Sequence, residues 1–340
     1  MLKKLPELLL PWFAENRRDL PWRKDRQPYH IWLSEIMLQQ TRVEAVREYY
    51  ARFLKRFPTI PELAAAEEDE LLKLWEGLGY YSRARNLQKA AKIICEEYSG
   101  AFPQNYDQIL SLPGIGTYTA GAISSICFEQ PTAAVDGNVL RVLSRFLASD
   151  ASITDEKTKK QFAKELSSVY PQGHCGDFTQ ALMELGATVC IPNGVPMCEV
   201  CPLQNLCRAN LQAIQQRYPV KAAKKPRRHE KRTVFILRCG EKLAVCKRSE
   251  KGLLAGLWQL PDMQGELTLS QMLAQAEAWG VHPRNILKTV QRSHIFTHVE
   301  WELTGCYLEC GAEATFYWAS PEEIREKIGL PTAYRQFLED

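Results

Sequence analysis

A Leu-Pro-Gly-Ile-Gly bend followed by a run of small residues constrains this chain more than any other feature. A helical pattern ends at Leu112, Pro113 and Gly114 break it, and Gly116 permits a second tight bend. A new helix is expected from about Thr117, where small residues allow close packing. Two helices joined in this way leave free backbone N–H groups at the start of the second helix, and such groups can hold a DNA phosphate without reading a base.

The carboxylate of Asp136 follows one helix after this bend. A glycine pair alone would more often only turn a helical hairpin. The longer strings LPGIGTYTAGAI and VDGNVLRVLSR, however, resemble the helix-hairpin-helix DNA glycosylases of the endonuclease III superfamily. The resemblance implies that Gly114 and Gly116 bind the DNA backbone beside the lesion, and that Asp136 lies at the sugar whose bond is cut.

Length and charge indicate more than one domain and a basic connector. A chain of 340 residues suggests two or three domains at roughly 150 residues each. Hydrophobic residues make up 45% of the chain and charged residues 24%, so little of it should be disordered. The formal charge is only +3, but residues 220–232 hold seven Lys or Arg against Glu230, a local net charge of +6. We therefore predict an exposed basic linker over 219–232; solubility of a connector explains the charge as simply as contact with DNA does.

The chain carries no pattern typical of secretion or of a membrane. The N-terminal string MLKKLPELLLPW has too short an apolar core for a secretory signal, and no run approaches the ~20 apolar residues of a membrane span. Eleven cysteines without a signal argue against a disulfide scaffold. We expect a reducing cytoplasm, with the protein associated with the nucleoid if the cell is bacterial.

The hydrophobic pattern changes at the basic segment. Residues 1–218 are almost entirely helical in pattern, with helical spacing over 31–57, 63–78, 86–98 and 162–170 and no repeat of solenoid length. Beyond the linker, strands are expected at 233–238, 242–246, 301–308 and 315–318, and helices at 269–279 and 321–328. The prediction is thus a multi-domain chain: an all-α domain over 1–218, then an α+β domain over 233–340.

Four cysteines, Cys190, Cys198, Cys201 and Cys207, form a C-x7-C-x2-C-x5-C pattern. Four thiolates within eighteen residues can surround one metal centre, and all-thiolate ligation suits both zinc and a 4Fe–4S cluster. Glycosylases of this superfamily carry a C-x6-C-x2-C-x5-C cluster after the catalytic helices, with a CPL string like Cys201-Pro202-Leu203 here. The resemblance implies an iron–sulfur cluster in a loop over 190–207, which holds basic groups against DNA. The first gap is one residue longer in this chain, and Gly194 and two prolines suggest a loop that absorbs it.

Glu35 lies among apolar residues in the string HIWLSEIMLQQT. Burial disfavours the charged form of a carboxyl, so such a group can hold a proton near neutral pH and give it away. A helix-surface glutamate is the plain alternative. The string SEIMLQQT resembles the SExMLQQT helix of MutY-type adenine DNA glycosylases, in which the glutamate is the catalytic acid.

Two carboxylates fit the cleavage of an N-glycosidic bond. Protonated Glu35 would donate to adenine N7, and ionised Asp136 would face the developing oxocarbenium ion. Water directed by Glu35 in its basic form, or a transient covalent link through Asp136, would complete hydrolysis. Asn138 and Tyr118 are expected to orient Asp136; the alternatives are a helix-cap amide and a packing tyrosine.

Tyr118 separates two kinds of glycosylase. Endonuclease III-type enzymes place a lysine in the helix after the hairpin, and its amine attacks the sugar and allows strand cleavage through a Schiff base. The matching string here is Gly-Ile-Gly-Thr-Tyr-Thr-Ala, with Tyr118 at the lysine's place. A phenol cannot form that imine, so we predict a monofunctional glycosylase that leaves an abasic site.

An adenine must leave the duplex stack to be cut, and the gap needs filling. Tyr80, in a Gly-Leu-Gly-Tyr-Tyr string, resembles the family's wedge beside the lesion, and Gln40 a second inserting side chain. By the same resemblance Trp22 and Arg23 border the adenine pocket, and Gln180 matches a position that contacts the base. Core packing is the alternative for Tyr80.

The second domain is similar to the MutT-like, Nudix-fold domain that MutY-type enzymes carry after a linker. Its helix LSQMLAQAEAWG lacks the acidic residues of the Nudix hydrolase box, so it should not hydrolyse nucleotides. The family uses a Phe-Ser-His loop here to recognise 8-oxoguanine, and this chain has Phe296, Thr297 and His298. Threonine keeps the hydroxyl and adds a methyl, so we expect recognition with an altered fit; a strand-end turn is the alternative.

The resemblance covers nearly the whole chain and implies a MutY-type enzyme that excises adenine opposite 8-oxoguanine or guanine. We expect a monomer that binds double-stranded DNA containing these pairs. Three other functions use part of the same features: a glycosylase/lyase on oxidised pyrimidines, a DNA lesion-binding protein without catalysis, and a nucleotide pyrophosphohydrolase. The missing lysine and the added domain disfavour the glycosylase/lyase. The presence of both Glu35 and Asp136 disfavours a binding protein without catalysis, and the missing acidic box disfavours a pyrophosphohydrolase.

Overall fold

The computed structural model describes residues 1–223 and 226–339 and divides into two compact units. The first unit comprises residues 1–65 and 86–223. The second joins residues 66–85 to the C-terminal part of the chain. The predicted domain boundaries at 218 and 233 assign 66–85 to the helical domain and stay a prediction. Lys224 and Lys225, in the predicted basic linker, lie outside the described residues.

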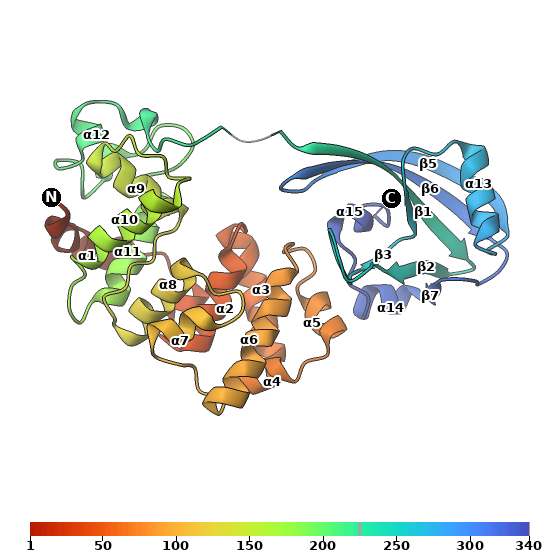
Figure 1. Ribbon diagram of the computed structural model, residues 1–340, viewed down its shortest axis with the longest axis horizontal. Coiled ribbons are helices and arrows are strands. Elements are labelled where there is room, and N and C mark those ends of the chain that lie inside the picture. Colours follow the sequence, from red (N-terminus) through yellow and green to blue (C-terminus); the bar gives the residue numbers. More distant parts are fainter. Residues whose placement is uncertain (224–225, 340) are drawn as a thin grey trace. The chain divides into compact units, whose positions relative to one another are not determined.

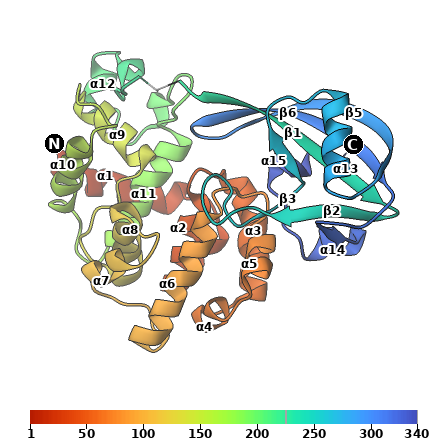
Figure 2. The same cartoon turned by 45° about the vertical axis from the view of Figure 1, so that its right-hand side comes forward.

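The N-terminal two thirds of the chain is helical (Figure 1). The helices are α1 (Leu5–Asn16), α2 (Pro28–Leu38), α3 (Val43–Arg56), α4 (Ile60–Ala64), α5 (Glu68–Leu74), α6 (Ser82–Tyr98), α7 (Tyr106–Ser111), α8 (Thr117–Phe128), α9 (Gly137–Leu147), α10 (Glu156–Ser167), α11 (Cys175–Thr188) and α12 (Arg208–Leu211). In this unit α8 packs against α2 and α11, as both ribbon views show (Figures 1 and 2). This packing brings the helix after the Pro-Gly bend against the helix that carries Glu35.

The helical pattern predicted over 31–57 is two helices in the structure. Alpha-helix α2 ends at Leu38 and α3 begins at Val43. Between them Gln40 adopts a left-handed backbone conformation with φ of 62°, which no helix continues through. The pattern over 63–78 is also interrupted, because α5 covers only Glu68–Leu74 and a loop follows it.

One hydrophobic core of the first unit lies between α1, α9, α10 and α11. Its fully buried side chains include Phe13, Phe146 and Phe178. Three of the four clustered cysteines, Cys190, Cys201 and Cys207, pack against the same core. The cysteine loop is therefore joined to the helix α9 that follows Asp136.

The second unit is built on a mixed sheet with strand order β3-β2-β1-β6-β5, with β4 paired to β1 and β7 to β2. Strands β1 and β6 are parallel and the other pairs are antiparallel. The elements are β1 (Arg228–Cys239), β2 (Lys242–Lys247), β3 (Trp258–Gln259), β4 (Asp262–Gln264), α13 (Leu269–Ala278), β5 (Pro283–Ile295), β6 (Val299–Cys310), β7 (Tyr317–Ala319), α14 (Pro321–Glu326) and α15 (Thr332–Arg335). Two elements differ from those expected from the sequence. Strand β5 is not among the expected strands, and β1 begins at Arg228, within the segment assigned to the linker.

Alternation along β1 builds a core on each face of this sheet. Val234 and Ile236 pack with Tyr334 of α15 on one face, and Phe235 and Leu237 pack with α13 on the other. The period of two is what a strand buried on both faces requires. Helices α13 and α15 therefore cover opposite faces.

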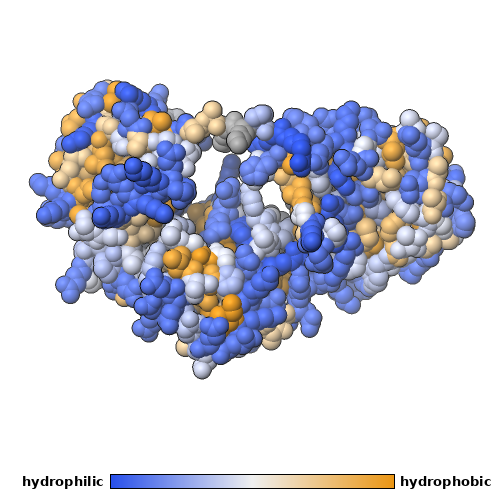
Figure 3. Space-filling view, viewed as in Figure 1, coloured by the Kyte–Doolittle hydropathy of each residue, from blue (hydrophilic) through white to orange (hydrophobic). Residues whose placement is uncertain are grey.

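Figure 3 shows a largely hydrophilic face with hydrophobic residues in small patches, one of them over the region of α12. Among the described residues, no helix combines the length and the apolar character needed to cross a bilayer.

Candidate active site

The carboxyl of Glu35 is shielded from water by its own helix and by α8. Helix α2 buries every residue from Ile31 to Met37, and Glu35 is only 6% exposed. Burial raises the pKa of Glu35 to about 7. A hydrogen bond from the Tyr118 hydroxyl to Oε2 opposes the shift, and the negative charge of Asp136 adds to it. A carboxyl with this pKa holds its proton for a large share of the time at neutral pH.

Tyr118 acts on Glu35 rather than as a support that hydrogen-bonds Asp136. It is the second residue of α8, and its hydroxyl donates to the Glu35 carboxylate. Burial, together with the charges of Glu35 and Asp136, raises the pKa of Tyr118 well above its usual value. The phenol therefore stays protonated and serves as a donor. The expectation that Tyr118 orients Asp136 by direct contact is corrected in this respect.

Asp136 is fixed at the start of α9. Its Oδ1 accepts from the backbone N–H of Val139 at 2.7 Å, which is an N-cap, and its Oδ2 accepts from the Asn138 side-chain amide at 2.7 Å. Burial raises the pKa of Asp136, and these hydrogen bonds pull it back. Because the charge of Asp136 acts on both Glu35 and Tyr118, the structure brings positions 35, 118 and 136 together.

A second layer of contacts fixes Asn138, and the sequence analysis did not find it. Oδ1 of Asn138 accepts from Nη2 of Arg141 at 2.9 Å, and Arg141 also donates to the carbonyls of Gly186 and Cys190, both at 2.7 Å. A Cβ on Gly186 would lie 2.6 Å from Cβ of Asn138, so glycine is required at this crossing of α9 and α11. The signal in the sequence was a pair of arginines, Arg141 and Arg145, spaced by one turn in a helix that is otherwise largely apolar.

Arg23 belongs to a buried ion pair that the sequence analysis also missed. Glu184 of α11 is fully buried and accepts from Arg18 Nε at 2.8 Å and from Arg23 Nη2 at 2.8 Å. Burial alone would raise the pKa of Glu184, but these hydrogen bonds and charges lower it to about 2. The charge of Arg23 also reaches Glu35 and lowers its pKa slightly. Trp22 is buried and packs edge-on against Tyr50, with ring centroids 5.5 Å apart.

Three other residues are predicted to contact DNA near the adenine: Gln180, Gln40 and Tyr80. Gln180 is half-buried on α11, and its amide donates within its own helix to the Gly176 carbonyl at 3.4 Å. Gln40 is exposed at the break between α2 and α3. Tyr80 is 48% exposed and follows two glycines, Gly77 and Gly79, whose φ angles are positive. The exposure of Gln40 and Tyr80 is compatible with the predicted insertion into DNA, which stays a prediction.

The two hairpin glycines differ in what they require. Gly114 has φ of 79°, and an added Cβ would lie 2.7 Å from Cβ of Asn86, so it demands glycine on two grounds. Gly116 caps α8 in an ordinary extended conformation with open space around it, so the tight bend expected there is not formed. Gly116 and Thr117 are exposed, which leaves the first amides of α8 open to an anion.

The four cysteines line one pocket. Arg145 and Gln215 line it as well, and they donate to Sγ of Cys190 at 3.3 Å and Sγ of Cys198 at 3.7 Å. Arg145 is a buried cation, which favours negative charge on the sulfurs. Over residues 1–223 and 226–339, no three His, Cys, Asp or Glu side chains are gathered around the position of a single ion.

In the second unit, the 296–298 loop joins β5 to β6. Phe296 packs edge-on against Trp301 with centroids 4.8 Å apart, while Thr297 and His298 are exposed. The Thr297 hydroxyl is 2.9 Å from the Tyr80 hydroxyl. Helix α13 carries Glu277 as its sole acidic residue, so the acidic metal site of a Nudix hydrolase is missing from it.

Comparisons with known proteins agree with both halves of the chain. Residues 33–168 match the family described as "HhH-GPD superfamily base excision DNA repair protein", and residues 233–340 match the NUDIX domain. The adenine DNA glycosylase of Homo sapiens is 35% identical over 93% of this chain and 70% of its own length. That of Buchnera aphidicola subsp. Acyrthosiphon pisum is 31% identical over 98% of this chain and 96% of its own.

Solved structures resemble the helical part. A thermostable thymine-DNA glycosylase is 30% identical with a TM-score of 0.57, covering 62% of this chain and 97% of that one. Endonuclease III in a trapped covalent intermediate with DNA is 25% identical with a TM-score of 0.52, covering 63% and 95%. The predicted fold class, a helix-hairpin-helix domain followed by an α+β MutT-like domain, is confirmed.

The buried Glu184 pair should govern the stability of the helical unit. Glu184→Gln leaves Arg18 and Arg23 without their charge partner, and we expect it to lower the free energy of unfolding by about 3 kcal/mol. The folded pKa of about 2 lies below the ordinary 4.5, so the stabilisation is present above pH 4.5 and is lost as pH falls toward 2. Urea unfolding at several pH values measures this, with Glu48→Gln on exposed α3 as the control. Equal stability of Glu184→Gln and wild type at neutral pH would contradict it.

Proposed function

This chain belongs to the family of adenine DNA glycosylases, and we propose that it removes adenine paired with 8-oxoguanine or with guanine in double-stranded DNA. Membership of the family and the HhH-GPD match make it a base-excision repair glycosylase. The single observation that carries the mechanism is the Glu35 carboxyl, which is buried, bonded to Tyr118 and under the influence of the Asp136 charge.

The reaction follows from the two carboxyls. Protonated Glu35 gives its proton to N7 of an extruded adenine, and the electron pair of the N-glycosidic bond leaves with the base. Ionised Asp136, held by Val139 and Asn138, stabilises the positive charge that develops on the sugar. A water oxygen then bonds to the sugar carbon, and its proton returns to Glu35. The product is an abasic site.

DNA contacts are proposed for residues that are exposed or, like Phe296, partly exposed. Gly114 and Gly116 would receive the phosphate backbone, Gln40 and Tyr80 would enter the duplex, and Phe296, Thr297 and His298 would recognise 8-oxoguanine. Trp22, Arg23 and Gln180 would border the adenine. For Trp22 and Arg23 the contribution is to the wall behind the pocket, because Trp22 is buried and Arg23 is paired with Glu184.

The cysteine cavity supports a 4Fe–4S cluster. Cys190, Cys198, Cys201 and Cys207 would ligate it, and it would supply structural rigidity and negative charge next to Arg145. The cluster is not assigned a step in the reaction. Through the Cys190 carbonyl, Arg141 and Asn138, the loop that holds it is connected by hydrogen bonds to Asp136.

The substrate assay tests the proposal as a whole. Labelled duplexes holding adenine opposite 8-oxoguanine, guanine or thymine are incubated with the protein and then treated with alkali, which cuts abasic sites. Product is expected from the first two duplexes and not from the third. Excision of an oxidised pyrimidine with none of adenine would overturn the assignment.

Glu35→Gln should bind these duplexes but excise adenine about 10²–10⁴-fold more slowly, because an amide cannot act as the acid. In the wild type, single-turnover excision should fall as pH rises above about 7, where Glu35 loses its proton. At low pH it should fall again as Asp136 becomes protonated. Unchanged excision by Glu35→Gln, with tight binding retained, would remove Glu35 from its role.

The enzyme should leave the DNA strand intact. Tyr118 donates to Glu35, and its phenol cannot form an imine with the sugar. Borohydride added during turnover should trap no covalent complex, with an endonuclease III-type lyase as the positive control. A trapped complex together with strand cleavage in the absence of alkali would contradict the prediction.

Metal analysis separates the two candidate centres. The purified protein should be brown and contain about four irons and four sulfides per chain. Cys198→Ala should lower the iron content and destabilise the loop, whereas Cys239→Ala, in the second unit, should leave the iron unchanged. A colourless protein with one zinc per chain would show a zinc centre instead.

A further inference from the structure

Helix α5 and the turn after it are built into the C-terminal unit, although they lie near the middle of the helical sequence. Residues 66–85 form one compact unit with the C-terminal sheet and its helices. This segment ends in the turn that carries Tyr80. What fastens it to the C-terminal elements therefore determines where Tyr80 stands.

Lys73 is the first fastening point. Its ammonium donates to the carbonyls of Ile324 and Ile328, both at 3.0 Å, and to Glu76 Oε2 at 2.8 Å. The Ile324 carbonyl belongs to the last turn of α14 and the Ile328 carbonyl to the segment just after it, and a helix C-terminus favours a cation. The side chain of Lys73 is only 18% exposed, so the contact is largely shielded from solvent.

Glu76 is the second fastening point, three residues later. Its Oε1 accepts from the backbone N–H of Leu330 at 2.8 Å, and its Oε2 is 3.8 Å from Arg335 of α15. A Cβ added at Gly329 would lie 3.4 Å from the Leu72 carbonyl oxygen and from Lys73 Cα, so the chain at Gly329 runs close to the backbone of α5. The side chain of Glu76 is 11% exposed. Other links, such as Lys247 to Asp69 at 2.9 Å, are exposed and contribute less.

The turn transmits this position to Tyr80. Trp75 is fully buried, and its indole N–H donates to the Gly79 carbonyl at 3.1 Å. Arg83 closes the turn from the other side by donating to the Leu78 carbonyl at 2.9 Å. Tyr80 therefore projects from a closed turn that begins directly after Glu76.

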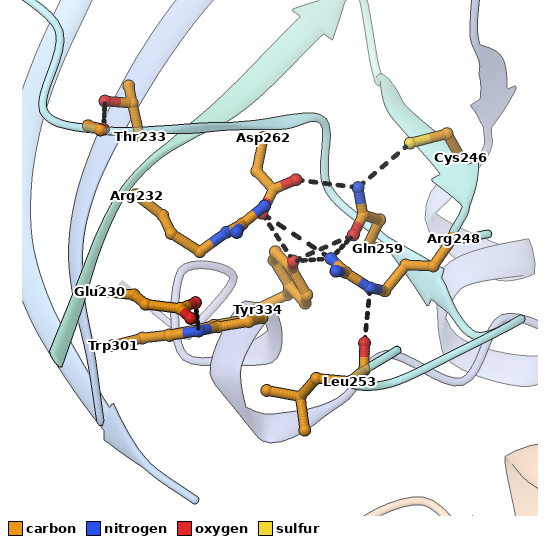
Figure 4. A network of polar contacts seen from close by, with 11 residues as sticks. Glu230, Arg232, Thr233, Cys246, Arg248, Leu253, Gln259, Asp262, Trp301 and Tyr334 are labelled. Carbon is orange, nitrogen blue, oxygen red and sulfur yellow. Dashed lines mark hydrogen bonds and ion pairs between the residues drawn. The ribbon is translucent and has the colours of Figure 1, made fainter. Parts of the chain in front are cut away.

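The loop that faces Tyr80 rests on the same C-terminal elements through Phe296 and Trp301. Figure 4 shows the polar network around Trp301, which includes Arg232, Asp262 and Tyr334. Phe296 packs on Trp301, and the Trp301 indole N–H donates to Glu230 at 3.0 Å while Arg232 lies 4.8 Å over its ring. Arg232 pairs with Asp262 at 2.6 Å, with side-chain exposures of 15% and 4%. Tyr334 of α15 donates to Asp262 at 2.9 Å, which joins this network to the helix that follows Leu330.

We propose that Lys73 and Glu76 are positioning residues that fix Tyr80 beside the 296–298 loop, so that both engage DNA as one body. The segment 324–335 is the shared base: one side receives Lys73 and Glu76, and Tyr334 supports the network under Trp301 and Phe296. This shared support accounts for the 2.9 Å contact between the Tyr80 and Thr297 hydroxyls. The inference rests on the proposed function, because it makes the loop's recognition of 8-oxoguanine depend on where the wedge stands.

The test compares Lys73→Met and Glu76→Gln with Lys327→Met, which removes a charge from the exposed side of the same α14 end. Single-turnover excision of adenine is measured opposite 8-oxoguanine and opposite guanine. The first two variants should lose about tenfold in rate opposite 8-oxoguanine and clearly less opposite guanine, because the wedge serves both substrates whereas the loop serves only the former. Lys327→Met should match wild type, and Lys73→Arg should restore most of the preference.

Two further measurements keep the proposal falsifiable. Amide hydrogen exchange at residues 77–81 should be faster in Lys73→Met and Glu76→Gln than in wild type. In a Thr297→Ala background, the further change Lys73→Met should alter the excision rate opposite 8-oxoguanine very little. Equal losses on both substrates, unchanged exchange in the turn, or effects that multiply in the double variant would each overturn the proposal. A wild type without preference for 8-oxoguanine would instead defeat the proposed function, while exchange would still test the fastening itself.

Discussion

Exclusion of water from the Glu35 carboxyl is the constraint on which the site depends. In water this carboxyl would be ionised at neutral pH and could give no proton to a leaving base. Helix α2 buries the residues on both sides of it, and α8 closes over it with the Tyr118 hydroxyl. The hydrogen bond limits the shift that burial imposes, so the pKa settles at about 7, where the group can both lose and regain a proton. The same packing that builds the core thus sets the chemistry.

Asp136 has the opposite requirement, because its carboxyl must stay ionised although it is partly buried. Two N–H groups point at its carboxylate, and Asn138 cannot turn its amide because Arg141 holds the other end. Arg141 in turn is held by carbonyls of Gly186 and Cys190. Two carboxyls within reach of each other's field therefore receive different environments, one apolar and one rich in donors.

The sequence predicted helices and strands well where hydrophobic periodicity and breaking residues such as Gly and Pro agree. It predicted buried charged side chains poorly. The helical half, the Pro-Gly bend and a strand over 233–238 followed from the local pattern alone. Strand β5 did not, because it is an edge strand with many exposed polar residues and little apolar contrast. The break at Gln40 was hidden by apolar residues that continue on both sides of it. Motif resemblance supplied Glu35 and Asp136, but Glu184, Arg141 and Lys73 escaped, since buried ionic partners come from distant parts of the chain. Arg232, counted with the basic linker, is paired with Asp262 in the sheet for the same reason.

The origin of the second unit in two separated segments has a consequence for biosynthesis. Lys73 is synthesised 251 residues before Ile324, whose carbonyl accepts its hydrogen bond in the folded protein. Until then its ammonium and the Glu76 carboxylate are solvated, and the surface of α5 that will meet Gly329 has no cover. The nascent helical half can close its own core around α8 and α11, but the turn that bears Tyr80 acquires its final restraint only when translation is almost finished. A polypeptide that stops short of α14 would emerge with its helices folded and this turn still unanchored.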